Sequence, residues 1–223
     1  MNVSDAIASR RSVRGFLDRP VDPALIRTIV EKAARAPSGG NLQPWHIDVV
    51  GGGELDRLKT IMAQRVFESP RGEPTEYDIY PNDLPEPYSN YRFAVGEELY
   101  RALGIPREDK AARLLWFARN FNFFGAPVAL FCTVRRSMGP PQWSDLGMYL
   151  QNVMLLLREA GLDSCPQECW AIFPQTIRTF LGIPEERILF TGMAIGWKDA
   201  ADKANDARPA RAPLAAFATF RGL

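Results

Sequence analysis

Three apolar runs, far apart along the chain and separated by stretches with helical spacing, constrain the fold most. The runs cover residues 45–50, 127–134 and 187–196, and each is typical of a buried or half-buried strand. Apolar residues recur at helical spacing over 25–34, 55–62 and 143–161, and a shorter helix is predicted over 173–182. Two more helices are expected at about 93–104 and 107–123, separated by Pro106. This mixture of elements predicts an α+β fold.

Composition excludes several classes of protein. The 223 residues carry a formal net charge of +1, which argues against a nucleic acid or a membrane surface as the main partner. With 46% apolar and 24% charged residues, the chain is an ordinary globular protein in composition. No apolar run approaches the length needed to span a bilayer, and the N-terminus does not resemble a signal peptide. We therefore expect a cytoplasmic location.

Cysteine and histidine are too few for most metal or nucleophile chemistry. The three cysteines, Cys132, Cys165 and Cys169, do not form a disulfide framework, and we expect them to be buried or incidental thiols. The single histidine, His46, excludes a His-rich metal site, and no metal is expected. A Ser-His-Asp triad would have to use His46, but no GxSxG turn accompanies it. We expect His46 to form structural hydrogen bonds.

Two N-terminal motifs carry most of the functional information. The first, RRSVR at 10–14, concentrates three cations and a hydroxyl in five residues. The second, PSGGNLQPWH at 37–46, is a loop of small and amide residues that leaves a helix and leads into a strand. Arginine binds phosphate bidentately, and amides hydrogen-bond to a flat polar ring. Together these motifs predict a site for flavin mononucleotide (FMN), held without a covalent bond.

Two segments lack a clear place in this scheme. From about Phe67 to residue 91 the chain is rich in Pro, Tyr and acidic residues, and it could be disordered, a linker or a lid. Its tyrosines favour a loop that packs against something. Near the C-terminus, Leu214, Phe217 and Phe220 require a surface to cover them, which a partner subunit would supply.

The sequence resembles the nitroreductase family of FMN-dependent oxidoreductases. Besides the two N-terminal motifs, the resemblance rests on SCPQE at 164–168 and GMAIGW at 192–197, in the family's order. It implies a single FMN-binding domain over residues 1–223, with a variable, lid-like segment at about 67–125. It also implies a central mixed or antiparallel sheet flanked by helices, and an intertwined homodimer whose two FMN sites are each built from both subunits.

The resemblance also implies roles for individual residues. The FMN phosphate, ribityl chain and pyrimidine oxygens would be held by Arg10, Arg11, Ser12 and Arg14. The other subunit would contribute Pro37, Ser38, Gly39, Asn41 and Gln43. A third group would lie against the isoalloxazine ring and direct a backbone N–H at flavin N5: Pro166, Gln167 and Glu168. Late basic residues that reach the phosphate would be Arg208 and Arg211. Within the segment 67–91, the length and aromatic content favour Tyr88 and Tyr91 as rings that stack on an aromatic acceptor.

The leading functional hypothesis is an NAD(P)H-dependent nitroreductase. NAD(P)H and then a nitroaromatic or quinone would use the same flavin face in ping-pong fashion, and no side chain is expected to act as a catalyst. Because no GxGxxG motif is present, NAD(P)H would bind only transiently. Two alternatives remain open: a reductive dehalogenase or flavin-modifying enzyme, whose acidic and aromatic lid would be residues 67–91, and a flavin-binding protein without turnover.

Overall fold

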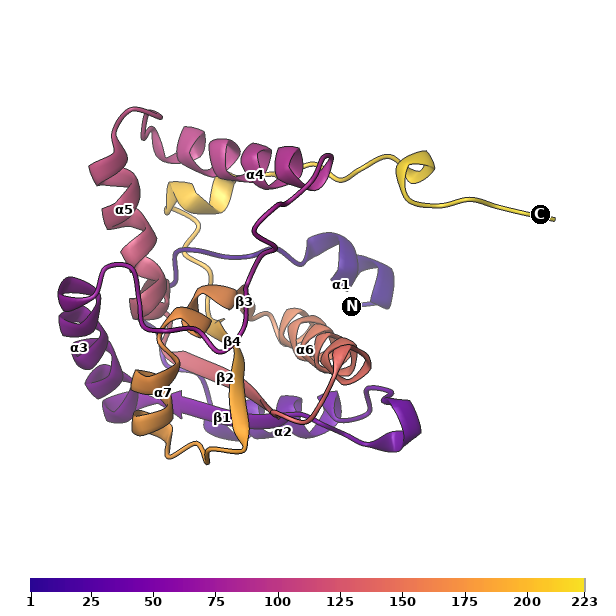
Figure 1. Cartoon of the computed structure of the whole chain (residues 1–223), viewed down its shortest axis with the longest axis horizontal. Helices are drawn as coiled ribbons and strands as arrows, with labels where there is room; N and C mark the ends of the chain where they lie inside the picture. Colours follow the sequence, from indigo (N-terminus) through magenta and orange to yellow (C-terminus); the bar gives the residue numbers. More distant parts are fainter. Residues whose placement is uncertain (223) are drawn as a thin grey trace.

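The computed structural model describes residues 1–222 and has one four-stranded sheet with helices on both faces (Figure 1). The strands are β1 (His46–Gly51), β2 (Val128–Arg135), β3 (Asp163–Gln167) and β4 (Arg187–Gly196). Their order in the sheet is β1-β2-β4-β3, and each neighbouring pair is antiparallel. The α+β class predicted from the sequence is confirmed.

Alternating side chains divide the interior into two cores, one on each face of the sheet. Leu130 and Cys132 pack with α2 (Pro23–Ala33) and α6 (Pro140–Glu159). Ala129 and Phe131 belong to the other core, with α3 (Gly52–Glu68) and α7 (Pro174–Leu181). Because successive strand residues point to opposite faces, a strand buried on both faces is apolar throughout. This explains why β2 and β4 are the continuous apolar runs of the sequence.

Local signals explain where several helices begin and end. The Asp22 side chain accepts a hydrogen bond of 2.9 Å from the backbone N–H of Ala24, which caps α2. Helix α6 begins at Pro140, earlier than the predicted residue 143, because proline suits the first helical turn and the Gln142 side chain accepts from the backbone N–H of Gly139 at 3.1 Å. Gly182 ends α7 in the left-handed conformation.

Three parts of the chain differ from the sequence-based prediction. Helix α4 (Tyr88–Leu103) begins before the predicted residue 93, and α5 (Lys110–Ala118) is shorter than predicted. The predicted end of α5 is instead η2 (Arg119–Gly125), where Phe123 and Phe124 take positive φ angles and bury their rings. Strand β3 was not predicted at all. It contains a proline and has no apolar alternation, and it is extended because it pairs with β4.

The remaining elements are α1 (Val3–Ser9) and four short 3₁₀ turns: η1 (Gly39–Asn41), η3 (Glu168–Ile172), η4 (Lys203–Asp206) and η5 (Leu214–Ala216). Helices α4 and α5 lie apart from the sheet, and the yellow C-terminal tail extends away from the body (Figure 1). No helix within residues 1–222 is long and apolar enough to cross a membrane.

The segment between α3 and α4 is packed against the body of the protein. The Glu73 carboxylate accepts a hydrogen bond of 2.8 Å from the backbone N–H of Gln175, at the start of α7. Glu76 pairs with Arg178 at 2.8 Å, and both side chains are largely buried. The Tyr77 hydroxyl donates to a backbone carbonyl of β4. These contacts favour a fixed cover over β4 and α7 rather than a disordered linker.

Candidate functional site

The N-terminal arginine motif lies along the outer edge of β3. Ser12 forms a parallel bridge with Ser164, and the backbone N–H of Val13 donates to the Ser164 carbonyl at 3.0 Å. The backbone N–H of Arg14 donates to the Asn205 side chain at 2.7 Å. Residues 10–14 are therefore held between the edge of the sheet and the C-terminal segment, next to residues 166–168 at the end of β3.

Asn205 ties the C-terminal segment to the N-terminal motif. Its side chain is buried and donates to the backbone carbonyls of Gly15 at 2.9 Å and Asp199 at 2.8 Å. The backbone carbonyl of Asn205 accepts from the Arg208 side chain at 2.7 Å. At Gly15, a Cβ atom would stand 2.3 Å from the carboxylate of Asp202, so only glycine fits. Sequence reasoning missed Asn205, because no spacing or periodicity connects it to residues so far away in the chain.

This arrangement gathers arginines whose charges are not compensated. Burial and the nearby Arg211 lower the pKa of Arg10. Burial raises the pKa of the Cys165 thiol, and the charges of Arg14 and Arg10 oppose that rise, so both arginines lie near this residue of β3. Within residues 1–222, none of Arg10, Arg14, Arg208 and Arg211 forms an ion pair with an acidic side chain.

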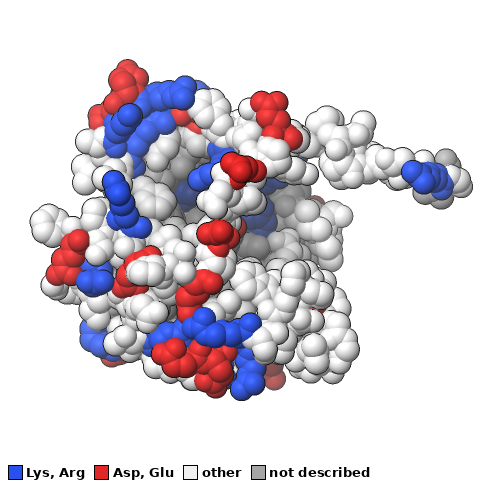
Figure 2. Space-filling model, viewed as in Figure 1, with Lys and Arg blue, Asp and Glu red and all other residues white. Residues whose placement is uncertain are grey.

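The side chains of Arg208 and Arg211 donate only to backbone carbonyls, which leaves their charges without an anionic partner. Several positive charges close together favour binding of an anion, and a phosphate group matches arginine in charge and geometry. Figure 2 shows Lys and Arg atoms inside the hollow between α4 and the body of the molecule. We call Arg10, Arg14, Arg208 and Arg211 the arginine cluster.

Arg11 has different surroundings from the arginine cluster. It lines a cavity of about 140 Å³ together with Ser9, Ser12, Arg158, Asp163 and Lys198, among others. Two of these residues, Arg158 and Asp163, form an ion pair at 2.8 Å. Along the extended chain, Arg10 and Arg14 share one side, and Arg11 points to the other.

At the end of β3, the side chains of Gln167 and Glu168 have different environments. The Gln167 side chain is buried, donates to the Asn120 carbonyl at 2.8 Å and accepts from the Trp170 indole at 3.4 Å. The Gln167 side chain is thus used inside the protein, where it holds the end of β3 against η2 and η3. Glu168 is exposed beside Tyr80, and burial together with this carboxylate raises the pKa of Tyr80. Sequence reasoning did not single out Tyr80.

The loop at 37–43 lies elsewhere, against α6. The backbone N–H of Gly39 donates to the buried Asp145 carboxylate at 3.3 Å, and that of Gln43 donates to the Ser38 hydroxyl at 3.0 Å. Asn41 and Gln43 adopt positive φ angles, and both side chains are exposed, as is Pro37. Within a single chain, therefore, this loop and the arginine cluster lie in different places.

Tyr88 and Tyr91 stand at the start of α4 with 59% and 46% of their surfaces exposed. The two tyrosines are three residues apart on the helix. Their neighbours in sequence, Ser89 and Arg92, line a cleft.

His46 is half-buried at the start of β1, where burial and the positive charge of Arg187 lower its pKa. The three thiols are free, as expected.

Comparison with known proteins agrees with this geometry. Residues 7–197 match the model of the Nitroreductase family. A nitrobenzene nitroreductase of Ectopseudomonas oleovorans is 36% identical over 98% of this chain and 96% of its own length.

Among solved structures, the FMN and NADPH-dependent nitroreductase NfnB from Sphingopyxis sp. strain HMH has a TM-score of 0.97 and 50% identity, covering 100% of both chains. The FMN-dependent NfnB from Mycobacterium smegmatis, solved with NADPH, has a TM-score of 0.92 and 30% identity over 98% of this chain and 97% of its own. The predictions of this fold, of a nitroreductase enzyme, and of FMN with NAD(P)H as cofactors are confirmed. The chain belongs to the nitroreductase family.

Proposed function

We propose that this protein uses NAD(P)H and bound FMN to reduce nitroaromatic compounds, and that quinones are further acceptors. The observation that carries the proposal is the arginine cluster beside the end of β3. Its charges lack acidic partners in the described chain, and it lies beside the edge strand β3, close to Cys165. A nitrobenzene nitroreductase among the relatives supports the class of acceptor.

The residues present fit FMN. Arg10, Arg14, Arg208 and Arg211 would bind its phosphate, and Ser12 would contribute a hydroxyl at the same edge of β3. The backbone at 166–168 would face the ring, with Pro166 and Glu168 at its border and the Gln167 side chain holding that backbone in place. When bound, FMN supplies the two-electron carrier that accepts a hydride from NAD(P)H and passes it to the acceptor.

We propose that the site is completed by a second copy of the chain. The loop carrying Pro37, Ser38, Gly39, Asn41 and Gln43 is held by Asp145 and exposes polar groups, and among residues 1–222 it forms no hydrogen bond with the arginine cluster. Gly39 and Gly40 carry no Cβ atom, which allows the backbone of this loop to approach a flat ring closely. In a homodimer this loop would meet the partner's FMN, with the whole chain acting as one FMN-binding domain. Arg11 would contribute least, because it points to the opposite side of the extended segment from Arg10 and Arg14.

A ping-pong order follows from the same residues. The chain contains no GxGxxG motif that would hold NAD(P)H in a site of its own. Donor and acceptor would therefore occupy the same open space in turn, bordered by the segment at 67–91 and by Tyr88 and Tyr91. No side chain needs to act as a strong acid or base, because proton and hydride chemistry is largely that of the cofactor.

The dehalogenase alternative is disfavoured by how the acidic residues at 67–91 are used. Glu68 and Glu73 pair with Arg65, and Glu76 pairs with Arg178. Tyr77 is bound to β4. Carboxylates already held in ion pairs cannot close over a zwitterionic substrate without breaking those contacts.

The direct test is turnover by purified, FMN-loaded protein. The protein should be yellow and should release FMN on heating, because no covalent link to the flavin is expected. NADPH oxidation under anaerobic conditions should require nitrobenzene and should continue over many turnovers. Flavin-loaded protein that shows a single reduction and no sustained oxidation would support the alternative of a flavin-binding protein without turnover. Colourless protein that does not take up FMN would overturn the proposal.

A further inference from the structure

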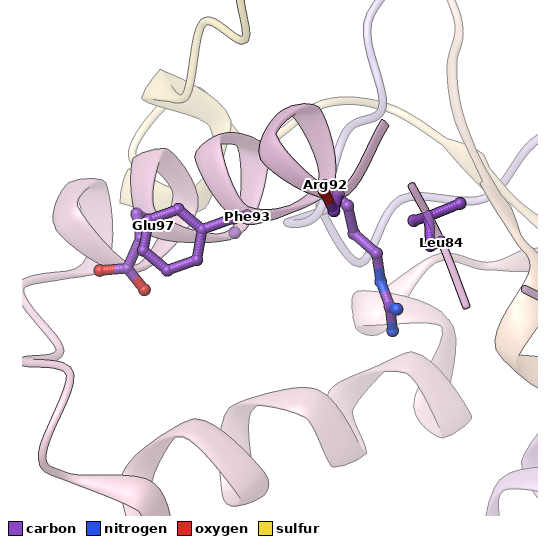
Figure 3. A pocket seen from close by; sticks show the side chains of 6 residues that line it. Leu84, Arg92, Phe93 and Glu97 are labelled. Carbon is purple, nitrogen blue, oxygen red and sulfur yellow. The ribbon is translucent and has the colours of Figure 1, made fainter. Parts of the chain in front are cut away.

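A cleft of about 360 Å³ lies between α4 and the chain that precedes it (Figure 3). It is lined by Leu84, Ser89, Arg92, Phe93, Gly96 and Glu97. Its volume falls within the range for sites that bind small molecules. Leu84 and Phe93 give it apolar walls, while Arg92 and Glu97 are its two charged residues.

The two charges of the cleft are not equivalent. Glu97 pairs with Arg113 of α5 at 2.7 Å, so its negative charge is compensated. Arg92 forms no ion pair with any residue from 1 to 222, and its guanidinium lies 4.1 Å from the centre of the Tyr80 ring. A cation stacked on an aromatic ring is held in place while its hydrogen-bond donors stay free. Among the residues that line the cleft, Arg92 is therefore the cation without an acidic partner, and Arg107 lies outside the lining, 5.0 Å from the centre of the Phe93 ring.

Tyr80 connects the cleft to the end of β3. One face of its ring lies against Arg92, and its hydroxyl end lies near the carboxylate of Glu168. Glu168 belongs to residues 166–168, which border the proposed flavin site. Arg92 thus stands one aromatic side chain, Tyr80, away from that border.

We infer that Arg92 determines specificity by binding an anionic substituent of the acceptor, so that the preferred substrates are nitroaromatic carboxylates. This inference rests on the proposed function. A planar guanidinium binds a carboxylate bidentately, and Phe93 and Leu84 would contact the ring between the two substituents. A para-substituted ring places its carboxylate at the end opposite the nitro group, so Arg92 would orient the nitro group toward the flavin.

The test compares 4-nitrobenzoate with nitrobenzene, which differ only in the carboxylate. The full, FMN-loaded chain is assayed with NADPH as the wild type and as Arg92→Gln, Arg92→Lys and Arg71→Gln. Arg71 is a suitable control, because it is an exposed arginine of the same segment with no hydrogen bond or ion pair among the described residues. FMN content and oligomeric state are measured for each variant.

Arg92→Gln should lower kcat/KM for 4-nitrobenzoate relative to nitrobenzene by about tenfold, the lower end expected for an exposed charge-assisted hydrogen bond. Arg92→Lys should keep part of the preference, since it retains charge but not the planar fork. Arg71→Gln should keep the wild-type ratio.

An unchanged ratio in Arg92→Gln would overturn the inference while leaving the proposed function intact. The inference would also be overturned if Arg92→Gln changed only the preference for NADPH over NADH in the anaerobic reduction of the flavin. Arg92 would then bind the additional phosphate group of NADPH and not the acceptor. Absence of turnover with both acceptors in the wild type would overturn the proposed function itself.

Discussion

At the scale of single residues, the sequence predicted which side chains carry charge but not how they are arranged. Arg10 and Arg14 were identifiable because the RRSVR motif concentrates cations in a few residues. The structure adds that they share one side of an extended segment, while Arg11 lines a different cavity. It also adds Asn205, whose contacts with Arg14 and Gly15 span almost the whole sequence. Such long-range contacts leave no local pattern in a single sequence.

The arginine cluster leads to a direct prediction for FMN binding. Arg10→Ala and Arg14→Ala should each weaken FMN binding about ten- to a hundredfold, because a hydrogen bond to a charged group contributes roughly 1.5–3 kcal/mol. Arg27→Ala is a matched control, since Arg27 is an exposed arginine of α2. The dissociation constant is measured by fluorescence as FMN rebinds to the apoprotein. Wild-type affinity in both cluster variants would show that the phosphate lies elsewhere.

At the scale of elements, periodicity predicted the long helices and apolar runs predicted three strands. The run at 187–196 coincides with β4, because a strand in the middle of the sheet is apolar on both faces. Strand β3 was missed because an edge strand of five residues with a proline has no such pattern. The path of the segment at 67–91 was equally hidden, since it depends on Glu73 and Glu76 meeting α7.

Helix α4 places Tyr88 and Tyr91 together in its first turn, so their effect is predicted at the scale of the element. We predict that Tyr88→Ala and Tyr91→Ala change kcat/KM by unequal factors among nitroaromatic acceptors, since a stacked ring contributes differently to each substrate. FMN content and the rate of flavin reduction by NADPH should change much less. The measurement is a steady-state comparison across a series of substituted nitrobenzenes. Uniform losses for every acceptor, with loss of FMN or of the dimer, would instead show that α4 covers the flank of a dimer.

At the scale of the whole molecule, the C-terminal tail of the described chain carries large apolar side chains that no other part of the same chain covers. Leu214, Phe217 and Phe220 of the tail are 56%, 71% and 62% exposed, and the tail extends from the body (Figure 1). Large exposed apolar patches mark interaction surfaces. The sequence already suggested a partner from the late aromatics, and the isolated position of the 37–43 loop provides a second reason.

A dimer should therefore persist at all practical concentrations, and it should depend on the tail. Removing the residues after Arg211 would leave partner contacts unmade and should yield aggregated or flavin-free protein. Light scattering combined with the flavin absorbance measures both properties in one experiment. A flavin-loaded monomer of either the full or the shortened chain would contradict a site shared between subunits.

In the proposed reaction, this chain uses FMN to move a hydride from NAD(P)H to a nitroaromatic acceptor in two separate half-reactions. The most direct measurement mixes the yellow protein anaerobically with one equivalent of NADPH, follows the flavin absorbance, and then adds nitrobenzene. The yellow colour should be lost in the first step and should return in the second, with the nitro compound consumed. A flavin that NADPH does not bleach, or that nitrobenzene does not reoxidise, would contradict it.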